Sequence, residues 1–475
     1  MPFYTWLRPR SDDKPETLKT KQRAAEKIKD LRAAFKAHLD AATLPQDVQL
    51  PSDSSRYVRI ATWNLREFDA TSYGKRSQEA KAYIAEILSN FDLIALQEIR
   101  RDLGPLNDVK SLLGPNWEYI ATDVTEGDSG NDERMAFLFN RDKVLFRHVA
   151  GELTLPDGKK VTDPFGDRFR IEGGARFELP AGKILASPTG LKTSKLASGQ
   201  TKVEEDVEIP IPDGAKVVLP PGSLVRFAKN ARVPLTASGG IAIEATSTPT
   251  IPESAEIVLP PNSLVGGPKQ FARTPFIVSF QAGWLKINLA TVHIYYGSGD
   301  AGVEQRKEEI RRLTELLAER AENDNDSDSE SYFIVLGDFN IVDRQHETMK
   351  ALQTNGFVTP DPLQKIPGSN VKQDKFYDQI ALWTGKSGRR KTYTRIIPYR
   401  AGVFDYFDVV YRTDEEETYH PFMRKADSTE FYSSYATWRT YQMSDHLPMW
   451  VELQVDFAGD YLDDVEADLQ ARMNG

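Results

Sequence analysis

Short apolar runs separated by two helical patterns occupy most of the chain. The runs are wholly apolar or alternate between apolar and polar residues, which predicts strands. They cover 57–64, 92–98, 135–140, 275–280, 284–293, 332–338, 378–383, 407–411 and 448–455. Helical periodicity over 77–91 and 303–322 predicts two helices. Many short strands and a few helices favour two packed, mostly antiparallel sheets flanked by helices, that is, a four-layered α/β sandwich.

Residues 166–271 have a different composition. They contain no Trp, Tyr, Met or His, yet they hold 12 of the 28 prolines of the chain. The segments 211–225 and 251–265 are identical at 10 of 15 positions and lie 40 residues apart, and a weaker copy begins at Ala175. Repeated strand-and-turn units of this kind predict a compact β-rich insertion.

The two ends of the chain lie outside this pattern. Apolar residues recur at helical spacing from Ala24 to Phe35, so we expect a helix over 17–42 that is exposed or lightly packed. A helix that lies on the domain or in an oligomer is favoured over a functional arm. The polar stretch 322–331 is expected to be a solvated loop. The predicted organisation is an N-terminal helix and linker (1–55), a catalytic domain (56–165 and 272–456), the β-rich insertion (166–271) and a C-terminal tail helix (457–475).

Composition excludes several classes of protein. The sequence has no apolar run long enough to span a membrane and no secretory signal pattern at its start. The absence of cysteine excludes disulfides, thiolate zinc sites and cysteine nucleophiles, and we expect a cytoplasmic protein. A net charge of −10 argues against nonspecific wrapping of nucleic acid, but a nuclease needs only a local basic strip.

Polar residues stand at the ends of the predicted strands, where buried strands can hold side chains rigidly toward a cleft. Their types match hydrolysis of a phosphodiester. Histidines supply an acid and a base near neutral pH, and carboxylate and amide oxygens can bind a hard cation. No Walker-type loop, GxSxG elbow or HExxH helix is present. The residues are Asn64, Arg66, Glu98, Arg100, His293, Asp338, Asn340, Asp378, Asp445 and His446.

Five segments, TWNLREF, IALQEIR, ATVHIYY, VLGDFNI and MSDHLP, occur in the order found in the endonuclease/exonuclease/phosphatase superfamily. The chain resembles this superfamily over about residues 57–165 and 272–455. Within it, WNLREF, QEIR, DERMAFLFNRDKV, FARTPF, FYDQIAL and SDHLP are similar to segments of pancreatic-type deoxyribonucleases. The resemblance therefore implies a metal-dependent phosphodiesterase, and a DNA endonuclease in particular.

The resemblance also implies a role for each matching residue. His293 would pair with Glu133 and His446 with Asp378, as two carboxylate-steered imidazoles that share acid and base duties. Asp338 and Asn340 would orient the attacking water and a phosphate oxygen. Glu98, with Asn64 and Asp445 nearby, would hold Mg²⁺ or Mn²⁺, with Ca²⁺ as an alternative structural ion. The flanking phosphates would be bound by Arg66, Arg100 and Arg273.

One loop departs from the deoxyribonuclease pattern. Segment 126–134 carries Asp128, Asn131 and Asp132 where the secreted enzymes have an aromatic and basic segment, and the two aspartates would repel a duplex backbone. Two alternatives to a DNA endonuclease follow. One is a phosphodiesterase or phosphatase acting on a lipid head group or another small phosphate ester. The other is a scaffold whose β-rich insertion binds a protein partner or a second copy of the chain.

Overall fold

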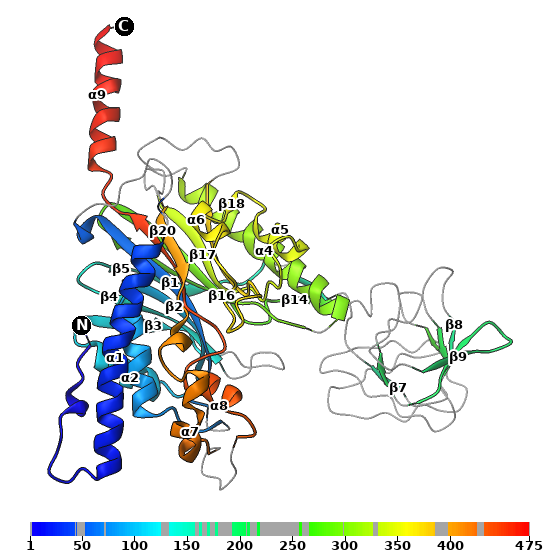
Figure 1. Ribbon diagram of the computed structural model, residues 1–475. Helices are drawn as coiled ribbons and strands as arrows, with labels where there is room; N and C mark the ends of the chain where they lie inside the picture. Colours follow the sequence, from blue (N-terminus) through cyan, green and yellow to red (C-terminus); the bar gives the residue numbers. More distant parts are fainter. Residues whose placement is uncertain are drawn as a thin grey trace. The chain divides into compact units, whose positions relative to one another are not determined.

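The computed structural model divides the chain into two compact units (Figure 1). One unit comprises residues 1–154, 271–296 and 309–475, and the other comprises 155–270 and 297–308. The structure describes residues 2–42, 44, 53–70, 73–124, 133–156, 161–163, 169–171, 176–178, 192–205, 207–209, 216–218, 256–258, 266–297, 299–325, 331–384, 398–424 and 432–474.

The first sheet of the larger unit has six strands in the order β20-β21-β1-β2-β4-β3. Strands β1 and β2 pair in parallel, and the other neighbours are antiparallel. The register of β1 with β2 shifts between Asn64 and Phe68, where Arg66 and Glu67 adopt positive φ angles. The strands are β1 (Tyr57–Phe68), β2 (Leu93–Arg100), β3 (Trp117–Ala121), β4 (Glu133–Asn140), β20 (Pro398–Val403) and β21 (Met449–Gln454).

The second sheet also has six strands, in the order β18-β19-β17-β16-β15-β5. Its single parallel pair is β16 with β17, which places His293 opposite Asp338. Asp338 in turn lies opposite Asp378 at the start of β19. The strands are β5 (Leu145–Glu152), β15 (Phe276–Ala282), β16 (Leu285–His293), β17 (Tyr332–Asp338), β18 (Phe357–Val358) and β19 (Asp378–Trp383).

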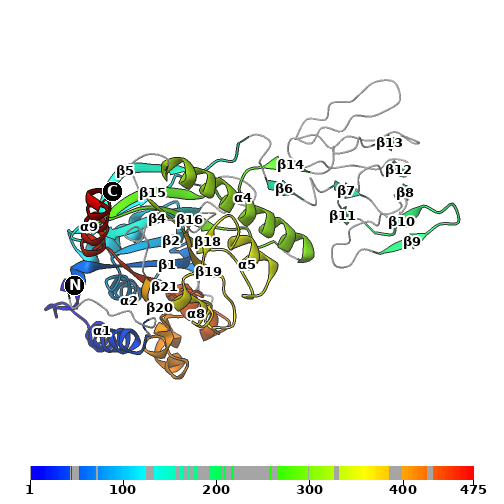
Figure 2. The same cartoon turned by 90° about the horizontal axis from the view of Figure 1, so that it is seen from above.

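The two sheets pack face to face, with β1 and β2 in contact with β16, β17 and β19. Phe137 of the first sheet packs against Phe276 and Phe280 of the second. Figure 2 shows α1 and α2 on one side of the sheets and α4 and α5 on the other. The predicted four-layered fold is therefore confirmed. The helices are α1 (Pro15–Ala41), α2 (Gln78–Leu88), α3 (Gly104–Leu113), α4 (Gly299–Asn325), α5 (Glu347–Leu352), α6 (Asp361–Gln364), α7 (Glu416–Tyr419), α8 (Tyr435–Gln442) and α9 (Ala458–Asn474).

Helix α1 is packed much more firmly than its sequence indicates. Ala24, Ile28, Leu31 and Phe35 are all buried, and the ring of Phe35 meets those of Phe91 and Phe404 edge-on at 5.5 and 5.0 Å. Two bidentate ion pairs, Arg23–Glu79 and Arg32–Glu86, join the helix to α2. The helix therefore lies on the domain, as the sequence favoured, but the expectation that it is exposed or lightly packed is wrong. Its arginines pair with buried carboxylates that helical spacing alone does not reveal.

Three other expectations need correction. Residues 407–411 do not form a strand: Tyr406–Asp408 is a 3-10 turn, in which Asp405 accepts a hydrogen bond from the backbone N–H of Phe407. Phe407, Val410 and Tyr411 are buried while Asp408 is exposed. A run as short as this fits a turn as well as a strand, so periodicity could not decide. Strands β3, β5, β18 and β20 of the two sheets were not predicted. Helix α4 extends to Asn325, into the stretch expected to be a loop.

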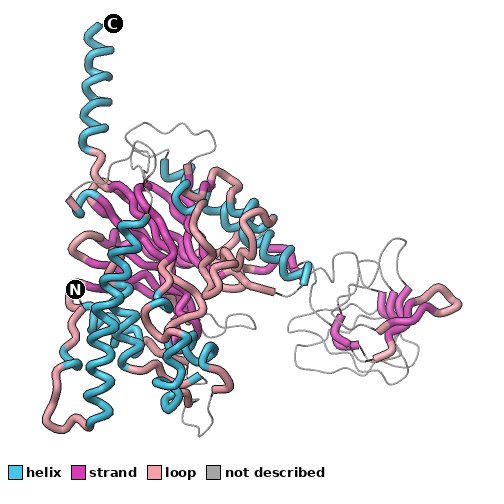
Figure 3. Tube along the Cα trace, viewed as in Figure 1, coloured by secondary structure: helices cyan, strands magenta, loops and turns pink. Residues whose placement is uncertain are grey.

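The smaller unit contains short strands, visible in Figure 3. Two strands from the repeated segments, β12 (Lys216–Val218) and β13 (Glu256–Val258), pair antiparallel around Val217 and Ile257. Strand β8 (Arg176–Glu178), from the weaker copy, pairs with the other edge of β12. The three copies are thus neighbours in one sheet. The remaining strands are β6 (Val161–Asp163), β7 (Phe169–Ile171), β9 (Thr193–Lys195), β10 (Thr201–Val203), β11 (Val207–Ile209) and β14 (Gly266–Lys269).

Within the ranges that the structure describes, every helix is too short or too polar to cross a membrane.

Candidate active site

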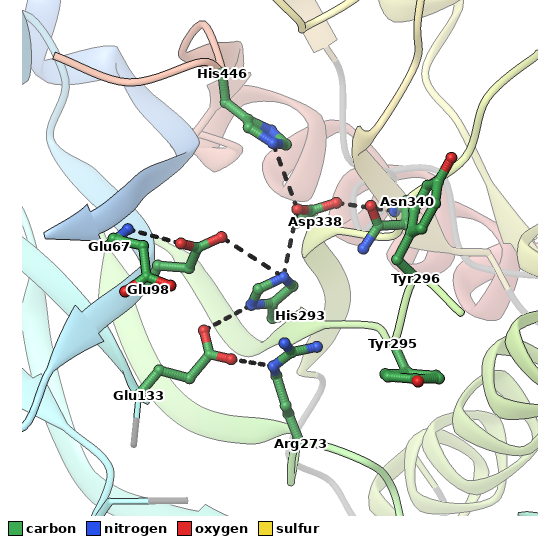
Figure 4. A pocket seen from close by; sticks show the side chains of 10 residues that line it. All are labelled: Glu67, Glu98, Glu133, Arg273, His293, Tyr295, Tyr296, Asp338, Asn340 and His446. Carbon is green, nitrogen blue, oxygen red and sulfur yellow. Dashed lines mark hydrogen bonds and ion pairs between the residues drawn. The ribbon is translucent and has the colours of Figure 1, made fainter. Parts of the chain in front are cut away.

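A cavity of about 340 Å³ lies in the larger unit, where the ends of β1, β2, β16 and β17 meet (Figure 4). It is lined mainly by titratable side chains: Glu67, Glu98, Glu133, Arg273, His293, Tyr295, Tyr296, Asp338, Asn340 and His446. Seven of these are residues that the sequence singled out. Four carboxylates against one guanidinium and two imidazoles make this a strongly polar and acidic cavity.

His293 is steered by a buried carboxylate. Its Nδ1 lies 2.8 Å from Glu133 Oε2, and its Nε2 lies 3.6 Å from Asp338 Oδ2. Burial alone would lower the pKa of His293, but the Glu133 carboxylate outweighs burial and raises that pKa above its ordinary value. The pKa of Glu133 shifts in the opposite direction. Burial would raise this pKa, but His293 and Arg273 together lower it below its ordinary value.

His446 has the same arrangement with a different carboxylate. Its Nδ1 lies 2.7 Å from Asp378 Oδ2, and its Nε2 lies 3.7 Å from Asp338 Oδ2. Burial would lower the pKa of His446, but the charges of Asp378 and Asp338 raise it well above the ordinary value. Both imidazoles therefore direct Nε2 toward the same oxygen of Asp338, from opposite sides in Figure 4.

Asp338 is the central acceptor of the site. Its Oδ1 accepts the backbone N–H of Asn340 at 2.9 Å, and its Oδ2 accepts the side-chain amide of Asn64 at 3.0 Å. Burial would raise the pKa of Asp338, but the two imidazoles and these donors lower it. Asn340 has a φ of 53°, and its Nδ2 donates to the backbone oxygen of Ile294 at 2.7 Å. This bond ties the β17 end to the segment that follows His293.

Of the three residues predicted to hold a metal ion, Glu98 alone lines the cavity. Its Oε1 accepts Asn64 Nδ2 at 2.8 Å, and its Oε2 accepts the backbone N–H of Glu67 at 2.7 Å. The carboxamide oxygen of Asn64 already accepts the backbone N–H of Arg66, so Asn64 orients Glu98 and Asp338. The structure does not bring Asp445 to the cavity: it is partly exposed and pairs with Arg66 at 3.5 Å.

Among the described residues, ligand atoms of Glu98, Glu133 and His293 lie close enough together to hold one cation. Two of these side chains are already hydrogen-bonded to each other, because Glu133 accepts from His293 Nδ1. Glu133 also accepts from Arg273 Nε. A cation on Glu133 would have to displace both donors. Glu98, held at both oxygens but still partly exposed, is the better donor for an oxygen-preferring ion.

The three arginines predicted to bind phosphate are all paired with carboxylates. Arg273 donates to Glu133, and Arg100 Nη1 lies 3.1 Å from Glu67 Oε2. Arg66, besides its pair with Asp445, has its guanidinium 4.0 Å from the ring centroid of Tyr441. Only Arg273 lines the cavity itself. Asp128, Asn131 and Asp132, the residues of segment 126–134 that were expected to oppose duplex binding, lie outside the described residues.

Sequence reasoning missed Glu67, Tyr295 and Tyr296. Glu67 has a φ of 49° and stands where the β1–β2 register shifts. Burial raises its pKa, which Glu98 and Glu133 raise further and Arg100 lowers. A signal was present, because Glu67 directly follows Arg66 in the segment WNLREF, and both tyrosines follow His293 within ATVHIYY.

Comparisons with known proteins agree on one family. The model of the Endonuclease/Exonuclease/phosphatase family matches residues 61–446. Deoxyribonuclease-1 of the dog is 30% identical over 133 residues, which are 27% of this chain and 44% of that protein. The alignment thus spans less than half of the curated relative.

Solved structures show lower similarity. A humanized TDP2 from D. rerio is 12% identical, with 84% of this chain and 100% of that chain covered and a TM-score of 0.39. A mannosyl-6-phosphatase from Bacteroides thetaiotaomicron is 14% identical, with coverages of 83% and 99% and a TM-score of 0.38. The human Nocturnin catalytic domain is 12% identical, with coverages of 84% and 93% and a TM-score of 0.36.

Proposed function

The chain belongs to the Endonuclease/Exonuclease/phosphatase family, and we propose that it is a divalent-metal-dependent phosphodiesterase that cleaves DNA as an endonuclease. The family comprises metal-dependent phosphoester hydrolases. The observation that carries the proposal is the pair of imidazoles: His293 and His446 each hold a buried carboxylate at Nδ1 and direct Nε2 toward one oxygen of Asp338.

Each imidazole is prepared for proton transfer at Nε2. The carboxylate of Glu133 or Asp378 accepts the Nδ1 proton, fixes the tautomer and stabilises the imidazolium. In the proposed reaction one Nε2 removes a proton from a water molecule, whose oxygen forms the new bond to phosphorus. The other Nε2 gives a proton to the ester oxygen as its bond to phosphorus breaks. A diester and water thus become a monoester and an alcohol.

The donor set fits a hard divalent cation. Glu98 presents a carboxylate whose orientation Asn64 and Glu67 fix by hydrogen bonds. Oxygen donors of this kind suit Mg²⁺ or Mn²⁺, and the described part of the chain has no thiolate. When bound, such an ion would place positive charge beside the phosphate oxygens. The acidity of the cavity supports a need for such an ion, because a phosphate would otherwise face four carboxylates.

Asp338, Asn340 and Arg273 complete the proposed site. The Asp338 carboxylate, between the two imidazoles, would orient the attacking water. Asn340 would hold a phosphate oxygen, and its Nδ2 bond to Ile294 keeps it in place. Arg273 reaches the cavity wall while paired with Glu133, so it would act on phosphate from a fixed position.

Two observations bear on the substrate. The relative that matches in sequence is a deoxyribonuclease by name, which favours DNA. The pairing of Arg66 with Asp445 and of Arg100 with Glu67 favours the second candidate, a small phosphate ester such as a lipid head group. Such an ester needs no extended basic strip, whereas a DNA backbone does.

Nicking of supercoiled plasmid in Mg²⁺, compared with phosphate release from lipid and inositol esters, tests this proposal. We expect nicking that EDTA abolishes and that Mg²⁺ or Mn²⁺ restores. His293→Ala and His446→Ala should each lose about a hundredfold or more in turnover, while the exposed His148→Ala serves as the matched control. Full nicking after chelation would refute the metal role. Turnover of small esters without nicking would establish the second candidate.

A further inference from the structure

The cavity has two chemically different sides. Glu67 and Glu98 lie on one side in Figure 4, and Tyr295 and Tyr296 lie on the other, beyond Asp338 and Asn340. The carboxylate side suits a cation and the charged phosphate. The tyrosine side suits the organic part of the substrate, so the question is which chemical group it would accept.

Three rings form a continuous path from the acid–base site to the surface. The ring of Tyr377 lies 5.5 Å from the imidazole of His446, tilted by 35°. Tyr296 meets Tyr377 edge-on, with the ring centroids 6.5 Å apart and an interplanar angle of 89°. Tyr296 is 50% exposed at the end of this path. Of these two tyrosines, Tyr296 lines the cavity, so a group attached to the phosphate beside His446 would meet the Tyr296 ring as it leaves.

The backbone beneath these rings is anchored to the catalytic strand. Ile294 donates its N–H to Asp338 O at 2.8 Å and accepts from Asn340 Nδ2 at 2.7 Å. Phe339, between them, donates its N–H to Tyr377 O at 2.8 Å. Both tyrosine-bearing segments are thus hydrogen-bonded to the loop that holds Asp338. These bonds fix the backbone, and the edge-on contact with Tyr377 restricts the Tyr296 ring, so the ring can bind a flat group with little further loss of side-chain freedom.

We propose that Tyr296 is a stacking platform for an unpaired nucleobase next to the scissile phosphate, so that single-stranded DNA is cleaved faster than duplex DNA. Stacking on an aromatic side chain is how proteins bind bases of single strands, and it tolerates any sequence because every base has a π-face. In a duplex the bases stack on one another and are not available to the ring. This inference rests on the proposed nuclease function.

Hydrolysis of an oligothymidylate, compared with an oligomer of equal length and charge built from abasic units, tests the proposal. The two share a backbone and differ only in their bases. Wild-type protein should prefer the oligothymidylate. Tyr296→Ala should lose about tenfold in kcat/KM on it and nothing on the abasic oligomer, whereas Tyr296→Phe should retain wild-type behaviour. Trp284→Ala, which removes an exposed ring outside the cavity lining, is the matched control.

The outcomes separate this inference from the proposed function. If wild-type protein cleaves neither oligomer with Mg²⁺ or Mn²⁺, the nuclease proposal itself falls. If it cleaves both and Tyr296→Ala loses equally on both, or on neither, the stacking role is overturned while the nuclease remains. Faster cleavage of duplex than of single strand overturns it as well. A loss confined to a lipid diester would assign the platform to a lipid head group instead.

Discussion

Neutralising Asp378 should change the pH dependence of the reaction as well as its rate. In Asp378→Asn, His446 keeps a polar neighbour of the same size but loses the charge that lies 2.7 Å from Nδ1. Burial, which by itself lowers the pKa of His446, then acts against a weaker opposing charge. A misoriented or wrongly protonated imidazole no longer contributes most of its acid–base catalysis to the reaction rate, so kcat should fall about 10²–10⁴-fold.

The direction of the pH change identifies the role of His446. The raised pKa keeps His446 protonated to higher pH in the wild-type protein. If His446 protonates the leaving oxygen, activity declines as pH rises through this pKa, and Asp378→Asn moves the alkaline limb of the profile to lower pH. If His446 is the base, the acidic limb moves to lower pH. Glu133→Gln should do the same to whichever limb belongs to His293.

Stability provides a second readout with its own sign. A group whose pKa is raised on folding stabilises the fold below its unfolded pKa, ordinarily 6.5 for His446, and this contribution is lost as pH rises through the folded pKa. The loss of Tm in Asp378→Asn should therefore be larger near neutral pH than at alkaline pH. Removing one partner of a buried ion pair lowers the free energy of unfolding by about 3–5 kcal/mol, because it leaves a buried charge without a partner. The loss is smaller when the imidazole releases its proton and becomes neutral.

The assay is initial-rate kinetics over a pH series for wild type, both variants and Asp463→Asn, an exposed carboxylate in α9 that serves as the control. The two variants should displace different limbs, because one imidazole gives a proton while the other takes one. An unchanged profile in either variant would remove that carboxylate from the mechanism. Displacement of the same limb by both would refute the division of acid and base duties.

Four further predictions follow from particular contacts. Glu98→Gln should raise the Mg²⁺ concentration for half-maximal activity with little change in Tm, and an unchanged metal titration would contradict a ligand role. Glu67→Gln removes the charged partner of Arg100, so KM for DNA should fall. The slope of the logarithm of the DNA-binding constant against the logarithm of the salt concentration should steepen by about one. An unchanged slope would show that Arg100 does not reach phosphate. Phe35→Ala should cost about 3–5 kcal/mol in urea unfolding, and a loss near zero would mean that α1 is not part of the core. Replacing residues 168–269 with a Gly/Ser linker should leave a folded, metal-dependent phosphodiesterase, because closure entropy grows only logarithmically with length; its substrate choice or its contact with a partner should change, and an insoluble product would count against this.

The strand pattern located the chemistry because strand ends are fixed by local sequence. His293 ends an apolar run, Asp338 ends another and Asp378 begins a third, and the sheet places the three at one level. Their pairing partners came from the family resemblance, since periodicity contains no information on which carboxylate faces which imidazole. The mistaken strand at 407–411 has a different cause: its five residues, with Asp408 exposed and Phe407, Val410 and Tyr411 buried, are too few for periodicity to distinguish a strand from a turn.

The carboxylate partners of the three arginines could not be predicted from the sequence. Arg66, Arg100 and Arg273 stand in motifs that suggest phosphate contacts, but each has a carboxylate partner. The partner of Arg66, Asp445, lies 379 residues away in the sequence, and the partner of Arg273, Glu133, lies 140 residues away. The partner of Arg100, Glu67, belongs to the neighbouring strand β1. Such pairs depend on which strands are adjacent, which the order of motifs along the chain does not reveal.

These pairs also constrain how a charged substrate can bind. An arginine that already neutralises a carboxylate adds little attraction for a distant phosphate, so long-range attraction should be weak in a chain of net charge −10. Under the proposed function, binding must then depend on short-range interactions inside the cavity, namely with a cation that Glu98 would hold and with the tyrosine rings. A small or single-stranded substrate can reach both at once. A rigid duplex would need a basic strip outside the cavity, and the pairing of Arg66 and Arg100 reduces what these two residues can offer it.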